Sequence, residues 1–133
     1  MVLKTFRQNE TWQVYQAIRD DKNEELLKKL ISEGKIKADT KNKEGVTPLL
    51  LCVDCEFSLA TLKSLVEEHG CSVADHDDQG RTALHFACDL ENEEIITFLL
   101  EHGADPEAQD LQGLSPMAES DFVKDWVAGH LSA

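Results

Sequence analysis

Glycine recurs along this chain in two series, each with a nearly constant spacing. Six of its seven glycines fall into two columns: Gly34, Gly70 and Gly103, and Gly45, Gly80 and Gly113. Each glycine of the first column ends a segment with helical apolar spacing, such as NEEIITFLLEHG. A glycine of the second column follows after 11, 10 and 10 residues and opens the segments GVTP, GRTA and GLSP. This pattern predicts a stack of similar units, because one small unit cannot bury its apolar face alone.

Each repeat carries the signals of two helices and a turn-rich loop. Thr47 and Thr82 suit helix N-caps, since a hydroxyl group there accepts a hydrogen bond from an unpaired backbone N–H. Pro48 follows at a position where its missing N–H costs nothing. Asn92 is the expected N-cap of a second helix, whose apolar stripe has the helical period: Ile95, Ile96, Leu99 and Leu100. The glycines that follow the second helices suit left-handed C-caps.

The chain is therefore expected to form one all-α domain over residues 1–133, a solenoid of about four stacked helix–turn–helix units. The units cover approximately residues 10–44, 45–79, 80–112 and 113–131. Helices are expected near residues 10–19, 24–33, 48–54, 59–68, 82–89, 93–102 and 121–131, with a shortened first helix (SPMAES) in the last unit. The end units depart from the repeat, as expected of units that cap the apolar faces of a stack.

Two segments carry a resemblance to a known family. TALHFA at 82–87, followed by LLEHGAD at 99–105, resembles the ankyrin repeat, whose period is about 33 residues. The similarity extends over roughly residues 10–131 and implies an ankyrin-repeat solenoid with capping end units. It also implies that His85 hydrogen-bonds to backbone and ties neighbouring loops together. The segment from Ala87 to Pro116 is also similar to the ankyrin tail of some acyl-CoA-binding proteins.

Charge is distributed unevenly along the sequence. The net charge is −13; residues 1–44 hold ten Lys and Arg against eight Asp and Glu, whereas residues 45–133 hold three against eighteen. A field of this sign repels phosphate backbones, so nucleic acid and anionic membranes are disfavoured as partners. It would steer a basic partner toward the C-terminal two-thirds; the alternative is that the acidic surface only aids solubility. With no apolar run of membrane-spanning length and no secretory signal, we expect a cytoplasmic protein, a nuclear location remaining open.

The cysteines and histidines offer no complete catalytic or metal constellation. Cys52 and Cys55 form the spacing CVDC, which occurs in redox pairs and in half zinc sites, but no second pair completes a tetrahedral site. In the repeat Cys52 shares a column with Ala87, which favours packing as a small apolar residue. We therefore expect free thiols, no enzyme activity, no cofactor and no metal.

The resemblance places partner binding on a concave surface of loop tips and first helices. In the second unit it implies Lys41, Lys43, Glu44, Val46, Asp54 and Cys55. In the third it implies His76, Asp78, Gln79, Arg81, Asp89 and Leu90, and in the last Gln109, Leu111, Gln112 and Leu114. Val46, Leu90, Leu111 and Leu114 are apolar at positions expected to be exposed, which is a feature of interfaces. The charge changes from Lys35, Lys37, Lys41 and Lys43 at one end to acids beyond them.

The resulting expectation is a non-catalytic module, a monomer on its own, that binds one or more proteins. The alternative is an accessory region of a larger ligand-binding protein, such as an acyl-CoA-binding protein. An enzymatic reading rests on CVDC alone. The terminal stripe of Phe122, Val123, Trp126, Val127 and Leu131 is expected to close the stack, with docking of a further domain through Trp126 as the other possibility.

Overall fold

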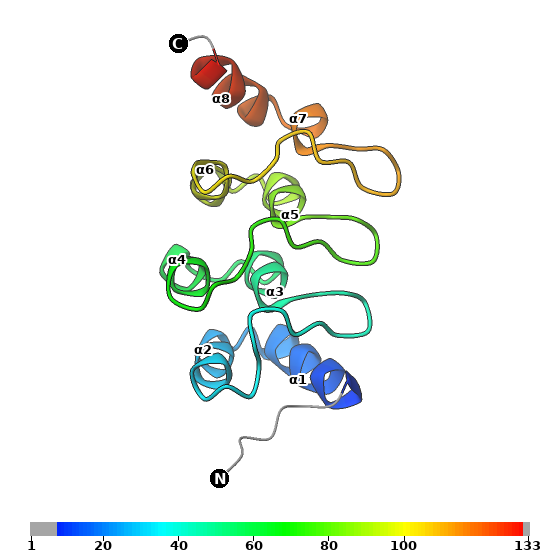
Figure 1. Ribbon diagram of the computed structural model, residues 1–133, viewed down its shortest axis with the longest axis vertical. Helices are drawn as coiled ribbons and strands as arrows, with labels where there is room; N and C mark the ends of the chain where they lie inside the picture. The colour runs from blue at the N-terminus through cyan, green and yellow to red at the C-terminus, as the bar shows by residue number, and fades with distance from the viewer. Residues whose placement is uncertain (1–7, 132–133) are drawn as a thin grey trace.

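The computed structural model describes residues 8–131, which form an all-α repeat solenoid. Eight helices are found within that range, arranged as four successive pairs (Figure 1): α1 (Gln8–Asp21) with α2 (Glu24–Ser32), α3 (Pro48–Asp54) with α4 (Leu59–Glu67), α5 (Ala83–Asp89) with α6 (Glu93–Glu101), and α7 (Pro116–Glu119) with α8 (Asp121–Leu131). The first helices of the pairs lie in one column and the second helices in another. None of the helices in residues 8–131 is both long enough and apolar enough to cross a membrane.

The helices begin at the capping residues that the sequence predicts. The hydroxyl groups of Thr47 and Thr82 each accept a hydrogen bond from the N–H of the residue three positions later, at 3.4 Å in both cases. Ser115 caps α7 in the same way at 3.2 Å. The side chains of Asn23 and Asn92 cap α2 and α6 in the same way. Because these caps satisfy backbone donors that a helix leaves unpaired, they fix where these five helices start.

Most expected helix bounds agree with the observed ones to within one residue, but the two end pairs differ. Helix α1 extends to Asp21, two residues beyond the expected end. The expected shortened helix of the last pair is a single turn, α7, because Ser120 is extended (φ −132°, ψ 118°) and separates it from α8. The predicted domain range also includes residues 1–7 and 132–133, which lie outside the described residues.

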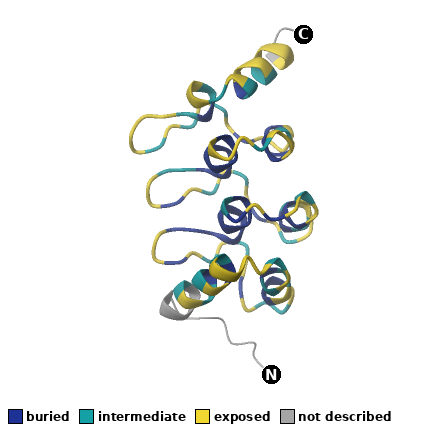
Figure 2. Cartoon of the chain, turned by 180° about the vertical axis from the view of Figure 1, so that it is seen from behind, coloured by how far each residue is buried: buried dark blue, intermediate teal, exposed yellow. Residues whose placement is uncertain are grey.

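The hydrophobic core runs through the middle of the stack. Figure 2 shows that α3 and α5 are buried almost all round, whereas α1 and α8 expose one side to solvent. Leu49 and Leu84, at matching positions of α3 and α5, are fully buried. In the terminal stripe Val123 is fully buried, while Phe122, Trp126 and Val127 are partly buried against the core. This packing supports a capping role for α8.

Candidate partner-binding surface

Three loops project from the same side of the stack, before α3, α5 and α7 (Figure 1). In each loop the Oδ1 atom of one Asn or Asp accepts hydrogen bonds from the backbone N–H groups two and four residues later, at 2.9–3.0 Å. These residues are Asn42, Asp77 and Asp110. Short polar side chains stabilise turns in this way, so each loop has a defined shape. We call the surface made by these loops and the exposed parts of α3, α5 and α7 the loop face.

Backbone contacts hold neighbouring loops in register. The N–H of Asp78 donates to the carbonyl of Glu44 at 3.0 Å, and the N–H of Leu111 donates to the carbonyl of Gln79 at 2.9 Å. Gly45 allows the first contact, because a Cβ atom there would lie 2.8 Å from the backbone nitrogen of Asp78. The loop face is therefore a continuous surface with a fixed spacing between loops.

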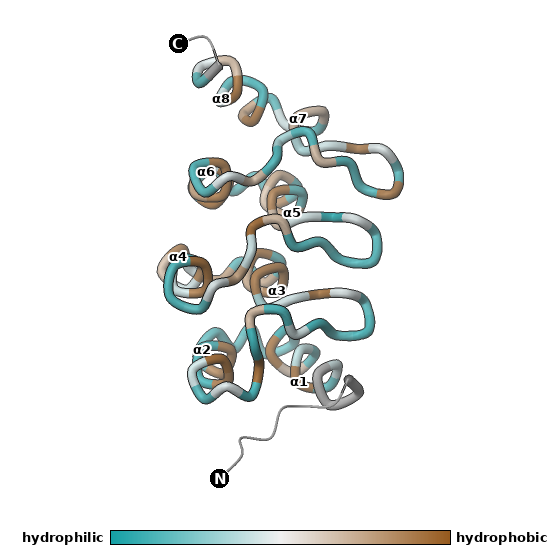
Figure 3. Tube along the Cα trace, viewed as in Figure 1, coloured by the Kyte–Doolittle hydropathy of each residue, from teal (hydrophilic) through white to brown (hydrophobic). Residues whose placement is uncertain are grey.

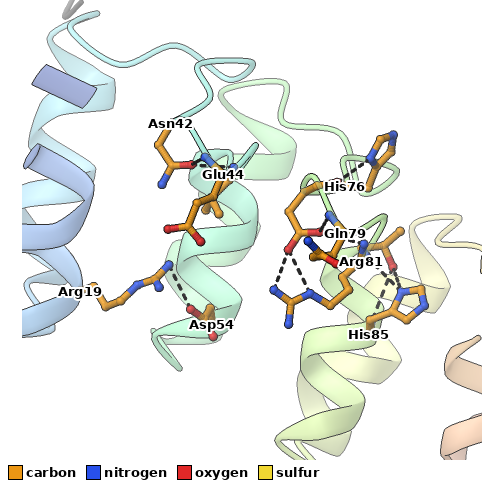
Figure 4. Close-up of polar contacts among 11 residues, drawn as sticks. Arg19, Asn42, Glu44, Asp54, His76, Gln79, Arg81 and His85 are labelled. Carbon is orange, nitrogen blue, oxygen red and sulfur yellow. Dashed lines mark hydrogen bonds and ion pairs between the residues drawn. The ribbon is translucent and has the colours of Figure 1, made fainter. Parts of the chain in front are cut away.

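His85 links the third and fourth pairs, as the family resemblance implies. Its Nδ1 accepts the N–H of Thr82 at 3.1 Å (Figure 4). Its Nε2 lies 2.9 Å from the carbonyl oxygen of Leu114. A carbonyl oxygen can only accept, so Nε2 carries the proton. The side chain is 2% exposed. His85 is thus a structural residue of the loops rather than a catalytic one.

Most of the predicted binding residues lie on the loop face with access to solvent. Asp54 and Arg81 are partly buried, and the others with access are exposed: Lys41, Lys43, Glu44, His76, Asp78, Gln79, Asp89, Leu90, Gln109, Leu111, Gln112 and Leu114. In the described residues, the exposed large hydrophobic side chains are Leu90, Leu111 and Leu114, at 37%, 73% and 41%. Figure 3 shows hydrophobic segments in the outer part of the last loop, whereas the outer ends of the first two loops are hydrophilic.

Two of the predicted positions are buried, where the sequence analysis expects exposure. Val46 is 6% exposed and Cys55 is 5% exposed, so neither can contact a partner directly. The first loop packs beside α1, where the ammonium of Lys43 lies 4.6 Å from the centre of the Trp12 ring. The Tyr15 hydroxyl also donates to the carbonyl of Thr40 at 2.8 Å. The sequence repeat gives the position of Val46 within its unit but not its burial.

The four cysteines are free and buried. Burial raises the pKa of the Cys71 thiol to about 12 and that of Cys88 to about 11, and it raises the pKa of Cys52 still further. Nucleophilic and metal-binding reactions require the thiolate, which burial disfavours at all of these sites. The described residues contain no group of three or more His, Cys, Asp and Glu arranged to hold a metal ion. Packing is therefore the role that the environment of these side chains supports.

A groove opens on the loop face between the third and fourth pairs, with a volume of about 270 Å³. Seven residues line it: Gln79, Arg81, Asp89, Asp110, Gln112, Leu114 and Glu119. Five of them belong to the predicted set. Asp110 and Glu119 are the two lining residues outside that set. Glu119 had a signal in the sequence: it occupies the column of Leu51 and Phe86, which is apolar in the earlier units.

The groove carries more negative than positive charge. Its one lining cation, Arg81, is bound by Asp77, whose Oδ2 lies 3.0 Å from Nε and 2.9 Å from Nη2 (Figure 4). Loss of hydration raises the pKa of Glu119, and the nearby carboxylate of Asp89 raises it further. Hydrogen bonds from the N–H groups of Leu114 and Gln112 lower the pKa of Asp110. The groove thus holds carboxylates that repel one another.

The matching position in the second pair is neutralised within the chain. Asp54, in the column of Asp89, forms an ion pair with Arg19 of α1 at 3.2 Å (Figure 4). Arg19 occupies the position in the first pair that Val53 occupies in the second pair. In the turn that follows each first helix, the carbonyl of this residue accepts a hydrogen bond from the N–H of the residue three positions later. Val53 is apolar and buried. No ion pair involves Asp89 among the described residues.

Comparison with known proteins agrees with this architecture. Residues 14–110 match a family model described as ankyrin repeats (3 copies). A human ankyrin repeat domain-containing protein 63 is 35% identical over 81 residues, which cover 59% of this chain and 21% of that protein. An ankyrin repeat protein of Fowlpox virus is 32% identical over 107 residues, 78% of this chain and 17% of the viral protein.

A third relative is a NAD-dependent deacetylase, sir2B, of Dictyostelium discoideum. It is 35% identical over 91 residues, which cover 62% of this chain but 12% of the deacetylase. The chain thus spans less than a quarter of the length of each of these relatives. Because the family model matches well over half of the chain, and the caps, loops and His85 link follow the same repeat, this protein belongs to the ankyrin-repeat family.

Proposed function

We propose that this chain is a non-catalytic protein-interaction module that binds a partner protein on its loop face. The four helix pairs act together as one domain, with units near residues 10–44, 45–79, 80–112 and 113–131. Ankyrin-repeat domains are in general modules for binding other proteins. The observation that carries the proposal for this chain is the exposure of the large apolar side chains of Leu90, Leu111 and Leu114, since exposed apolar surface often marks an interface.

The charge of the chain supports a protein as the partner. Residues 45–133 carry a net charge of −15, which opposes association with nucleic acids and with anionic membranes. Lys41 and Lys43 lie on the first loop and the acids lie beyond it, so a partner with acidic and basic ends would bind in one orientation. The module needs no cofactor in this proposal.

Affinity capture with single variants tests the proposal. Leu111→Glu and Leu114→Glu should each remove the proteins captured by the wild-type chain, because loss of an apolar anchor from an interface centre costs about 2 kcal/mol or more. Their stability should change by less than about 0.5 kcal/mol, as for other exposed positions. Ala60→Glu is the matched control, since it adds the same charge at an exposed position of α4. Retained capture by both leucine variants would contradict the proposed surface.

A second candidate is an accessory region of a larger ligand-binding protein. It is favoured by the lengths of the relatives, of which this chain spans 12% to 21% in the three described above. The intact mass of the natural product distinguishes the two candidates. A mass equal to that of 133 residues would contradict the second, and a mass several times larger would support it.

A further inference from the structure

The groove between the third and fourth pairs has a chemistry that narrows the choice of partner. Its carboxylates come from three separate elements: Asp89 ends α5, Asp110 lies in the loop before α7, and Glu119 ends α7. Against these three acids stands Arg81, whose guanidinium is occupied by Asp77 at 2.9–3.0 Å and lies 4.8 Å from the centre of the Phe86 ring. The lining residues therefore leave an excess of negative charge facing the groove.

We infer that this groove receives an arginine side chain of the partner, next to an apolar residue that packs on Leu111 and Leu114. The inference rests on the proposed function and specifies the part of the partner that the loop face recognises. Charge complementarity carries the inference: the groove is acidic, Asp89 and Glu119 have no ion-pair partner within residues 8–131, and the exposed Leu114 lines it. A partner segment that supplies both chemistries would bury the leucines and neutralise the acids together.

The second helix pair shows how this repeat accommodates such an acid. Asp54 ends α3 as Asp89 ends α5, and the chain itself provides Arg19 to pair with it at 3.2 Å. The corresponding cation for Asp89 would have to come from the position of Val53, which is buried. Within residues 8–131, Asp89 and Glu119 have no ion-pair partner. An arginine from outside would supply at Asp89 the contact that Arg19 makes at Asp54.

The size and geometry of the groove favour one long planar side chain. Its volume of about 270 Å³ lies below the range of about 300–1,000 Å³ of small-molecule sites. A guanidinium presents five N–H donors in one plane, so it can reach carboxylates on different walls at once. An ammonium is a compact, strongly hydrated charge that makes fewer such contacts. Arginine should therefore bind more tightly than lysine.

A phage-displayed library of random dodecapeptides provides the probe. Peptides selected on the wild-type chain should share an arginine with a neighbouring apolar residue. Replacement of that arginine by citrulline, which keeps the shape and removes the charge, should weaken binding at least tenfold, and replacement by lysine should weaken it less. The double variant Asp89→Asn, Glu119→Gln should lose binding to a similar extent. Glu94→Gln, Glu101→Gln is the control, because it makes the same charge change at exposed positions of α6.

The outcomes separate this inference from the proposed function. Peptides that lose binding to Leu111→Glu, but contain no basic residue and still bind the Asp89→Asn, Glu119→Gln variant, would overturn the arginine inference and leave the loop face as the binding surface. Peptides indifferent to both variants would overturn the loop face as well, and so would a selection that yields no peptide. Equal loss of binding by the α6 control variant would mean that the overall negative charge of the chain, and not the groove, attracts the peptide. That result would overturn the inference. Melting temperatures of all variants should lie within about 4 °C of that of the wild type.

Discussion

The two halves of the loop face follow the same repeat but differ in what covers them. In the first half, formed by the loop before α3 and the end of that helix, α1 provides the cover. Lys43 lies over the ring of Trp12, the hydroxyl of Tyr15 donates to the carbonyl of Thr40, and Arg19 neutralises Asp54. Apolar and acidic positions of the first half are thus satisfied within the chain.

In the second half, formed by the loop before α7 and the ends of α5 and α7, the equivalent positions remain available. Leu114, which matches Val46 in the repeat, is 41% exposed where Val46 is 6% exposed. Asp89, which matches Asp54, has no ion pair within residues 8–131. The repeat decides where a residue lies in its unit, and the neighbouring element decides whether that residue stabilises the fold or is available to a partner.

The largest expected effect comes from placing the same charge at the two matching positions. Val46→Glu should destabilise the protein by about 3–5 kcal/mol, because it buries a carboxylate without a partner. Leu114→Glu should change the free energy of unfolding by less than about 0.5 kcal/mol, since its side chain already meets solvent. Urea denaturation of the two variants measures the difference. Similar losses would mean that Leu114 belongs to the core and that the two halves are alike.

An intermediate effect is expected at the loop glycines. Gly45 and Gly113 have φ of 80° and 81°, so alanine at either position incurs about 1–2 kcal/mol of backbone strain. Gly45→Ala should cost about 1–3 kcal/mol more, because its new Cβ would lie 2.5 Å from Oδ1 and 2.8 Å from the backbone nitrogen of Asp78. A Cβ at Gly113 meets nothing within 4 Å.

Thermal denaturation of both alanine variants tests this difference. The difference in melting temperature between the two variants reports how tightly the second loop holds the first loop, because alanine in the last loop meets no neighbouring atoms. Equal melting temperatures for Gly45→Ala and Gly113→Ala would show that small shifts relieve the close contact between position 45 and Asp78. The first loop would then be held less rigidly against the second loop than this contact indicates.

Sequence alone predicts much of the fold because its signals are local. The caps at Thr47 and Thr82 and the left-handed glycines depend on residues close along the chain, and these predictions are confirmed. Such features need no knowledge of which elements pack together.

The errors concern contacts between units. Val46 is buried in the first loop, which packs beside α1, and the sequence of α1 departs from the repeat and gives no direct sign of its position beside that loop. The acidic groove depends on Glu119, which approaches Asp89 from the next pair. The sequence shows that Glu119 is a charged residue in a repeat position that is apolar in the two preceding units. Its meaning required the knowledge that Glu119 lies near Asp89 of the preceding pair, which the repeat pattern does not predict.

The smallest expected effect concerns the acids that end the matching helices. A carboxylate at a helix C-terminus faces the negative end of the helix dipole, which is unfavourable. At Asp54 this is offset by Arg19, so Asp54→Asn should cost up to about 1 kcal/mol, and less at high salt because the pair is partly exposed. Asp89→Asn removes an unneutralised charge beside Glu119, so it should leave stability unchanged or raise it by a few tenths of a kcal/mol, about the size of a surface charge effect.

Denaturation of the two asparagine variants at low and at high salt measures these small differences directly. At low salt we expect Asp54→Asn to be the less stable variant, with the two converging as salt screens the Arg19 pair. If Asp89→Asn loses as much stability as Asp54→Asn, then Asp89 already has a stabilising partner within this chain. The contrast between the two halves of the loop face would then fail, and with it the reason for an arginine from outside.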